Sequence, residues 1–126
     1  MKPEIKQRWI EALRSGAYQQ TQGQLRSAQQ PDCYCCLGVL TDLYLRDTQQ
    51  SWVLQAGLDE ENPGEEHYAC YNHYLELPSV VSDWAGFHNH PNPIVFDDNT
   101  AYALSELNDE LRLSFAEIAS IIDEQL

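Results

Sequence analysis

Three arginines near the start of the chain belong to the residue type best suited to binding an anion. Arg8, Arg14 and Arg26 lie within residues 1–30, which hold five of the seven basic residues but two of the twenty acids. The guanidinium group is a planar fork that matches a phosphate and can also stack on a nucleobase. The rest of the chain is acidic and would repel an anion, so we expect such a ligand at the N-terminal segment.

A tyrosine and several glutamines lie between Arg14 and Arg26, and they suit the recognition of a base. Tyr18 offers a ring for stacking, Gln22 offers an amide for a base edge, and Gly23 lets a backbone N–H approach a ligand. The predicted ligand-binding side chains are Arg8, Arg14, Tyr18, Gln22 and Arg26. The alternative is that the arginines pair with some of the twenty acids. A glycine pattern of the Walker or Rossmann type is missing, which argues against an ordinary ATP or NAD site.

Cys36 is a candidate nucleophile because it begins an apolar helical segment, where the helix dipole lowers the pKa of a thiol. His88 or His90 could act as its base and Asn89 or Asn92 could orient that base, in the chain order of papain-like cysteine hydrolases. A cysteine followed by Leu-Gly-Val-Leu is also typical of a small core residue, and we favour that interpretation. No catalytic residue is therefore assigned.

Cysteine and histidine side chains also supply enough donors for a zinc ion. These donors are Cys33, Cys35, Cys36, Cys70, His67, His73, His88 and His90. They do not form the two paired motifs, such as two C-x₂-C pairs, of the usual zinc sites, so we predict no metal site and no cofactor. A further group of side chains could line an aromatic binding surface, although we favour core packing for its tryptophans. The members of this group are Trp52, Tyr68, Tyr71, Tyr74 and Trp84.

Length and composition indicate one folded domain over residues 1–126, with 43% hydrophobic and 10% aromatic residues. The formal net charge of −13 argues against general nucleic-acid binding and against an anionic membrane surface. It is compatible with a basic protein partner or with mimicry of nucleic acid. The chain has no apolar run long enough to span a membrane and no signal peptide, so we predict a cytoplasmic protein with reduced cysteines.

Apolar spacing predicts helices at both ends of the chain and a buried helix between them. Residues 3–15 carry an apolar stripe at every fourth position, and residues 35–46 are apolar on more than one face. Gly38 within the second segment indicates close packing against another element. Residues 17–32 are predicted to form a loop, with an extended piece around residues 24–26.

The second half of the chain is predicted to form short strands followed by two helices. The predicted strands are residues 51–55, 67–77 and 94–96, with a short helix at 78–85. Leu104, Leu107 and Leu111 mark the first of the final helices, and Ser114 with Glu117 forms a capping box that opens the second. The sequence therefore predicts an α+β fold with a small, mostly antiparallel sheet.

Several short stretches resemble a family of small, largely uncharacterised proteins encoded by phages and prophages. They are Trp9-Ile10-Glu11-Ala12-Leu13-Arg14-Ser15-Gly16, Cys35-Cys36-Leu37-Gly38-Val39-Leu40, Trp84-Ala85-Gly86, Leu107-Asn108-Asp109 and Ser114-Phe115-Ala116-Glu117-Ile118-Ala119. The resemblance implies a protein made in the host cytoplasm during infection, but it carries no catalytic motif. Small accessory phage proteins often act on host defences, which is an analogy at the level of the family.

The residues and the resemblance together predict a binding protein without its own catalysis. We expect it to sequester a small anionic ligand, such as a nucleotide-derived host immune signal, and to form a homo-oligomer that buries this ligand. The first alternative is an inhibitor that docks its acidic surface on a host defence protein or mimics nucleic acid. The second alternative is the Cys36 hydrolase.

Overall fold

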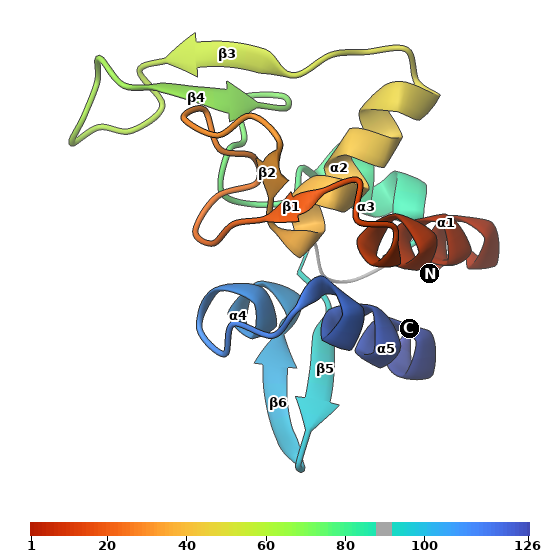
Figure 1. Ribbon diagram of the computed structural model, residues 1–126. Helices are drawn as coiled ribbons and strands as arrows, with labels where there is room; N and C mark the ends of the chain where they lie inside the picture. Colours follow the sequence, from red (N-terminus) through yellow and green to blue (C-terminus); the bar gives the residue numbers. More distant parts are fainter. Residues whose placement is uncertain (88–91) are drawn as a thin grey trace.

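The computed structural model describes residues 1–87 and 92–126. Within these residues the chain forms five helices and six short strands, which confirms the α+β class and a single small domain (Figure 1). The longest helices have 12 residues each, and none of the described helices has the length and apolar character needed to cross a membrane.

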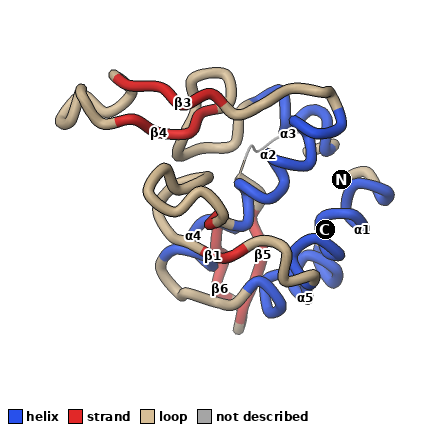
Figure 2. The backbone as a smooth tube through the Cα atoms, turned by 45° about the horizontal axis from the view of Figure 1, so that its top comes forward, coloured by secondary structure: helices blue, strands red, loops and turns tan. Residues whose placement is uncertain are grey.

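Helix α1 (Pro3–Arg14) confirms the predicted N-terminal helix. Its apolar stripe is buried, and Trp9 at the centre of the stripe donates a hydrogen bond of 3.0 Å from Nε1 to the carbonyl oxygen of Cys36. Along its length α1 packs against α5 (Phe115–Gln125), so the two ends of the chain lie on the same side of the molecule (Figure 2).

Helix α2 (Cys36–Asp47) is the predicted central helix, and nine of its twelve residues are buried. The close packing expected at Gly38 is confirmed, because a Cβ there would collide with the backbone carbonyl of Leu25. Through this contact the loop that precedes α2 packs closely against the first turn of the helix. It therefore fixes the backbone next to Arg26.

The strands of the described residues form three separate pairs. They are the parallel pair β1 (Gln19–Gln20) and β2 (Cys33–Tyr34), the antiparallel pair β3 (Val53–Ala56) and β4 (Glu66–Ala69), and the antiparallel pair β5 (Ile94–Asp97) and β6 (Thr100–Ala103). The strand predicted over residues 67–77 is shorter than expected, because Tyr71 and Asn72 turn the chain with φ angles of 50° and 67°. Strand β6 was not predicted from the sequence.

The remaining helices are α3 (Ser79–Ala85), which ends at Gly86 with a φ of 84°, and α4 (Leu104–Asp109). Leu111 is a correction to the prediction. It lies beyond the end of α4 and is 41% exposed, because Arg112 adopts a φ of 53° and the chain turns there instead of continuing the helix. The capping box of α5 is confirmed: the Ser114 side chain accepts from the backbone N–H of Glu117.

The hairpin of β3 and β4 extends away from the helices, with its connecting loop at the far end from α2 (Figure 1). The loop that carries β1 and the segment before β2 lies between this hairpin and α4 (Figure 1). Residues from the basic segment and from the acidic remainder of the chain therefore meet beside α2.

Candidate functional site

Two of the predicted binding residues, Arg8 and Arg14, lie on the exposed side of α1 and have separate partners. The guanidinium of Arg8 forms an ion pair of 3.2 Å with Asp47 at the end of α2. The guanidinium of Arg14 donates a hydrogen bond of 3.2 Å to the hydroxyl of Ser120 on α5. These two arginines thus link α1 to two different helices.

Tyr18 and Arg26 lie in a different place, within a group of aromatic side chains. The guanidinium carbon of Arg26 is 4.1 Å from the ring centre of Tyr68, 5.2 Å from that of Tyr34 and 5.9 Å from that of Trp52. The rings of Tyr18 and Tyr34 meet edge to face at 4.9 Å. We call Tyr18, Arg26, Tyr34, Trp52 and Tyr68 the Arg26 cluster.

Backbone hydrogen bonds from the loop before α2 hold Arg26 at this position. Leu25 is fully buried; its N–H donates to the carbonyl of Tyr74 at 2.8 Å, and its own carbonyl accepts from Cys35 at 3.2 Å. Arg26 itself pairs with Tyr34 in an isolated antiparallel bridge. Of the extended piece expected around residues 24–26, the bridge at Arg26 is present, and the Arg26 side chain reaches Tyr68 on the hairpin.

Asp42 on α2 organises the other side of the cluster. Its carboxylate accepts from the Tyr18 hydroxyl at 2.6 Å, from Arg46 at 2.9 Å and from the indole N–H of Trp52 at 2.9 Å. Burial and the neighbouring Asp42 carboxylate together raise the pKa of Tyr18 far above its usual value. The Tyr18 hydroxyl therefore stays protonated and remains a hydrogen-bond donor to Asp42.

The guanidinium of Arg26 differs from those of Arg8 and Arg46 because no carboxylate of the described residues neutralises it. Its Nε donates to the carbonyl oxygen of Pro31 at 2.7 Å. Among the described residues, its two terminal nitrogens have no hydrogen-bond partner and no acid forms an ion pair with it, whereas Arg8 and Arg46 each pair with an aspartate. One edge of this guanidinium is consequently available to a ligand.

No described contact joins the fifth predicted residue, Gln22, to the Arg26 cluster. The neighbouring Gln20 has a structural role instead, since its amide donates to Asn108 and to the carbonyl of Leu113, both at 2.8 Å. Asn108 is fully buried and also donates to the carbonyl of Thr21 at 2.8 Å. The glutamine-rich loop is therefore attached to α4 through Asn108.

Sequence reasoning missed two members of this site, Tyr34 and Asp42. The signal for Asp42 was a single acid inside a helix that is apolar on more than one face. Such an acid is buried only when hydrogen bonds satisfy its oxygens, so it indicates donors on the neighbouring elements. Trp52 and Tyr68 were named as members of an aromatic surface, but not as neighbours of Arg26.

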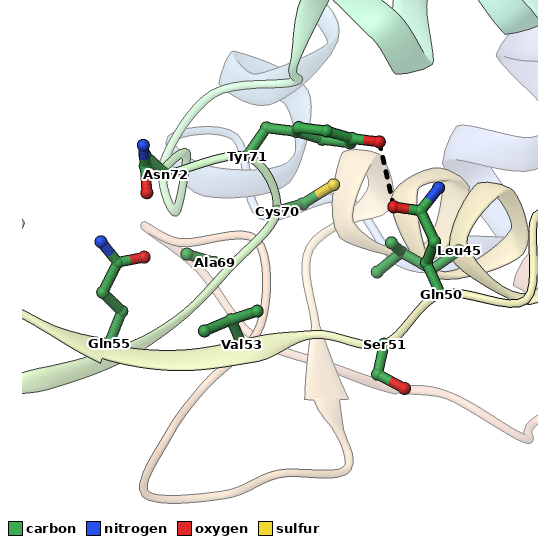
Figure 3. Close-up of a pocket in the computed structure, with 9 residues that line it drawn as sticks. All are labelled: Leu45, Gln50, Ser51, Val53, Gln55, Ala69, Cys70, Tyr71 and Asn72. Atoms are coloured by element: carbon green, nitrogen blue, oxygen red, sulfur yellow. Dashed lines mark hydrogen bonds between the residues drawn. The ribbon is translucent and has the colours of Figure 1, made fainter.

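Two of the cavities lined by described residues lie outside the cluster. A cavity of about 270 Å³ lies between the end of α2, β3 and the turn after β4 (Figure 3). Its lining residues are Leu45, Gln50, Ser51, Val53, Gln55, Ala69, Cys70, Tyr71 and Asn72. A second cavity, of about 420 Å³, includes the acids Glu76 and Asp109 in its lining. Neither cavity is lined by a lysine or an arginine, so neither suits an anion.

The whole chain, residues 1–126, matches the model of the family described as Domain of unknown function (DUF8296). The chain belongs to this family. No curated protein and no solved structure matches the chain. The description of this family names no activity, so the geometry of the side chains is the evidence for a function.

In this member of the DUF8296 family, Cys36 has the surroundings of a core residue. The residue is fully buried, and its Sγ lies 3.7 Å from the carbonyl oxygen of Leu104. Burial raises the pKa of the Cys36 thiol well above its usual value, so the nucleophilic thiolate does not form near neutral pH. His88, Asn89 and His90, the proposed base and orienting residues, lie outside the described residues.

The zinc donors considered in the sequence also remain apart in the described part of the chain. All four cysteines are free and buried. No group of three possible metal ligands among the described residues includes a cysteine. Asn92, the other orienting candidate, instead donates from its amide to the Ser105 hydroxyl at 2.7 Å.

Proposed function

We propose that this chain is a binding protein without its own catalysis, and that it holds a small anionic ligand with a planar ring at the Arg26 cluster. The observation that carries the proposal is the guanidinium of Arg26, which lies among three aromatic rings and has no carboxylate partner among the described residues. Aromatic faces stabilise a cation without cancelling its charge, as an acid would. The free edge of the guanidinium can therefore form paired hydrogen bonds with a phosphate.

A nucleotide fits this arrangement best. Its phosphate would meet the terminal nitrogens of Arg26, and its base would stack on a half-buried ring of the cluster, such as Trp52 or Tyr68. The attraction has to act at short range, because the net charge of −13 repels an anion at longer distances. The half-buried rings support the proposal of a nucleotide, because a protein environment of low dielectric strengthens the attraction between its phosphate and the guanidinium.

The resemblance to phage proteins supports a specific role for such a site. A phage-type protein in the host cytoplasm would sequester a nucleotide-derived immune signal and so oppose the defence that this signal activates. Burying the ligand between two copies of the chain would strengthen its retention, so we propose a homo-oligomer in the ligand-bound state. Membership in DUF8296 is compatible with this role but adds no support to it.

Recovery of the ligand followed by titration tests this proposal. The full chain is exposed to extracts of cells with active nucleotide signalling, and the released compounds are identified by mass spectrometry. Calorimetry then measures binding of the recovered compound and of AMP, GMP, cyclic AMP and cyclic di-GMP to wild type, Arg26→Gln and Arg26→Lys. We expect Arg26→Gln to lower the affinity about tenfold or more, and Arg26→Lys to lower it less, because lysine keeps the charge but not the fork.

Arg14→Gln is the matched control, because it removes an arginine of the same basic segment that lies on α1. It should leave the affinity unchanged. Recovery of no anionic compound, together with no binding from the panel, would contradict the proposal. Equal losses in Arg14→Gln and Arg26→Gln would assign the effect to overall charge and not to the cluster.

A second candidate function, docking on a basic host protein, is favoured by the hairpin of β3 and β4. Val53 and Leu54 on this hairpin are 56% and 47% exposed. The connecting loop adds Glu60, Glu61 and Glu65, all exposed. A protein interface has an apolar centre and a polar rim, and docking through an acidic rim should lose its association rate steeply as salt rises. A nucleotide held among aromatic rings should be less sensitive to salt.

A further inference from the structure

The loop between β3 and β4 brings three potential metal ligands together. One ligand atom each from Asp59, Glu65 and His67 lies within 4.8 Å of the others. Two carboxylates and one imidazole form a donor set typical of divalent transition metals. This group lies outside the Arg26 cluster, and the zinc donors considered in the sequence include only His67 of its members.

The loop fixes the carboxylate of Asp59 and the backbone of Glu65 independently of any ligand. Asp59 accepts from the backbone N–H of Glu61 at 3.0 Å and from the Asn62 amide at 3.2 Å. The backbone N–H of Glu65 donates to the carbonyl of Asn62 at 3.0 Å, which returns the chain toward Asp59.

His67 provides an independent observation that points to a ligand. The residue is 7% exposed, and its ring stacks on Tyr74 with 4.2 Å between the ring centres. Its Nε2 is buried and has no hydrogen-bond partner among the described residues. An enclosed polar atom without a partner is costly and rare, and at such a position it indicates that a ligand or ion completes the environment.

The ligand atoms of the group lie close enough together to be brought around a common ion. Within the described residues, neither a hydrogen bond nor an ion pair joins His67 to Asp59 or Glu65, although their ligand atoms lie within 4.8 Å. Two ligands that each bond a zinc ion at about 2.0–2.2 Å lie about 3.4 Å apart in a tetrahedral site. Small rotations of these side chains would therefore close the group around an ion.

We propose that the loop between β3 and β4 binds a divalent transition-metal ion, with Zn²⁺ as the best match, through Asp59, Glu65 and His67. The imidazole favours zinc over calcium or magnesium, which prefer oxygen ligands alone. The exposed Glu60 and Glu61 add negative charge around the loop and favour any cation there. A water molecule or a side chain of a partner would supply the fourth ligand.

Titration of the full chain with Zn²⁺, in buffer without chelators and with the thiols kept reduced, tests the proposal. Wild type should bind one ion in this loop and gain thermal stability from it. Asp59→Asn and Glu65→Gln should each weaken this binding about tenfold or more. Asn at position 59 has one acceptor oxygen and so loses one of the two hydrogen bonds that the Asp59 carboxylate accepts within the loop. Among the described residues the Glu65 carboxylate accepts no hydrogen bond, so Glu65→Gln isolates the loss of charge.

Glu60→Gln is the matched control, because it removes one acid of the same loop that is not part of the group. It should change the zinc affinity less than twofold. Titration with Co²⁺ separates this site from the four buried cysteines, since thiolate ligands give intense near-ultraviolet absorption that oxygen and nitrogen ligands do not. The ¹⁵N chemical shifts of His67 should move on binding and identify which ring nitrogen is the ligand.

Three results would overturn the proposal. They are the absence of zinc binding by wild type, equal affinities in Glu60→Gln and Glu65→Gln, and a thiolate absorption band with Co²⁺. His67→Gln alone is a weaker test, because the buried ring also stacks on Tyr74 and its removal affects folding. For this reason the two carboxylate variants carry the decision.

Discussion

Arginines of the same basic segment have two different environments in this molecule. Arg8 lies on a regular helix and forms an ion pair at the surface, where both side chains are more than 40% exposed, at 43% and 44%. Arg26 lies in a loop, among aromatic rings, and uses a backbone carbonyl in place of an acid. Identical side chains thus differ in their partners because of the elements around them, and of these two arginines the loop arginine is the one without a carboxylate partner among the described residues.

The comparison shows that the backbone contacts of an arginine decide its availability to a ligand more than its position in the sequence does. On α1, the helical period places Arg8 and Arg14 at the surface, where water and nearby acids compete for them. Around Arg26, backbone hydrogen bonds and the contact between Leu25 and Gly38 fix the side chain before any ligand arrives. Preorganisation of this kind lowers the entropic cost of binding.

The largest expected effect comes from Gly38→Ala, which breaks the contact that positions the Arg26 loop. The new Cβ would overlap the carbonyl of Leu25, so the loop and α2 would have to separate. We expect a loss of about 3 kcal/mol in the free energy of unfolding, measured by urea denaturation. Gly64→Ala is the control, because a Cβ at Gly64 meets no atom within 4 Å. Equal stability of the two variants would show that this contact is not tight.

A smaller loss is expected from Asp42→Ala, which removes the acceptor shared by Tyr18 and Trp52. Leaving these half-buried donors unpaired should cost about 2 kcal/mol. The pKa of Tyr18 should also fall toward its ordinary value, because the neighbouring carboxylate is one of the causes that raise it. Spectrophotometric titration of the tyrosines at alkaline pH measures this change.

The matched control for Asp42→Ala is Asp47→Asn, the exposed partner of Arg8. It should cost less than about 0.5 kcal/mol and leave the titration of Tyr18 unchanged. A Tyr18 pKa that stays the same after removal of Asp42 would contradict the geometry of the cluster. The two aspartates of α2 therefore test the interior and the surface of the same helix.

The helices could be predicted from the sequence because their signals are local. The stripe of α1, the apolar faces of α2 and the capping box of α5 each depend on residues within one or two turns of each other. The prediction of Leu111 as part of a helical stripe was wrong, because the period continued in the sequence while the backbone turned at Arg112. The spacing of apolar residues in the sequence does not indicate such a change in the φ angle.

The strands and the candidate site were harder to predict because they depend on contacts between distant residues. The pairing of Gln19 with Cys33 joins a polar loop to a buried strand, and polar loops carry no alternating apolar pattern. Arg26 and Tyr68 are likewise far apart in the sequence but only 4.1 Å apart between cation and ring centre. Residue types indicated that an arginine and aromatic rings were available, but not that they would meet.

The smallest effects are expected from Arg8→Gln and Arg14→Gln, and they sharpen the comparison with Arg26. Each variant loses one exposed contact of 3.2 Å, to Asp47 or to Ser120. Exposed pairs of this kind contribute less than about 1 kcal/mol, so the midpoint of urea denaturation should hardly move. A loss of about 2 kcal/mol or more in the free energy of unfolding would be on the order of that expected for a buried pair. It would show that α1 depends on these arginines for its packing. It would also show that the surface and loop environments do not differ as described.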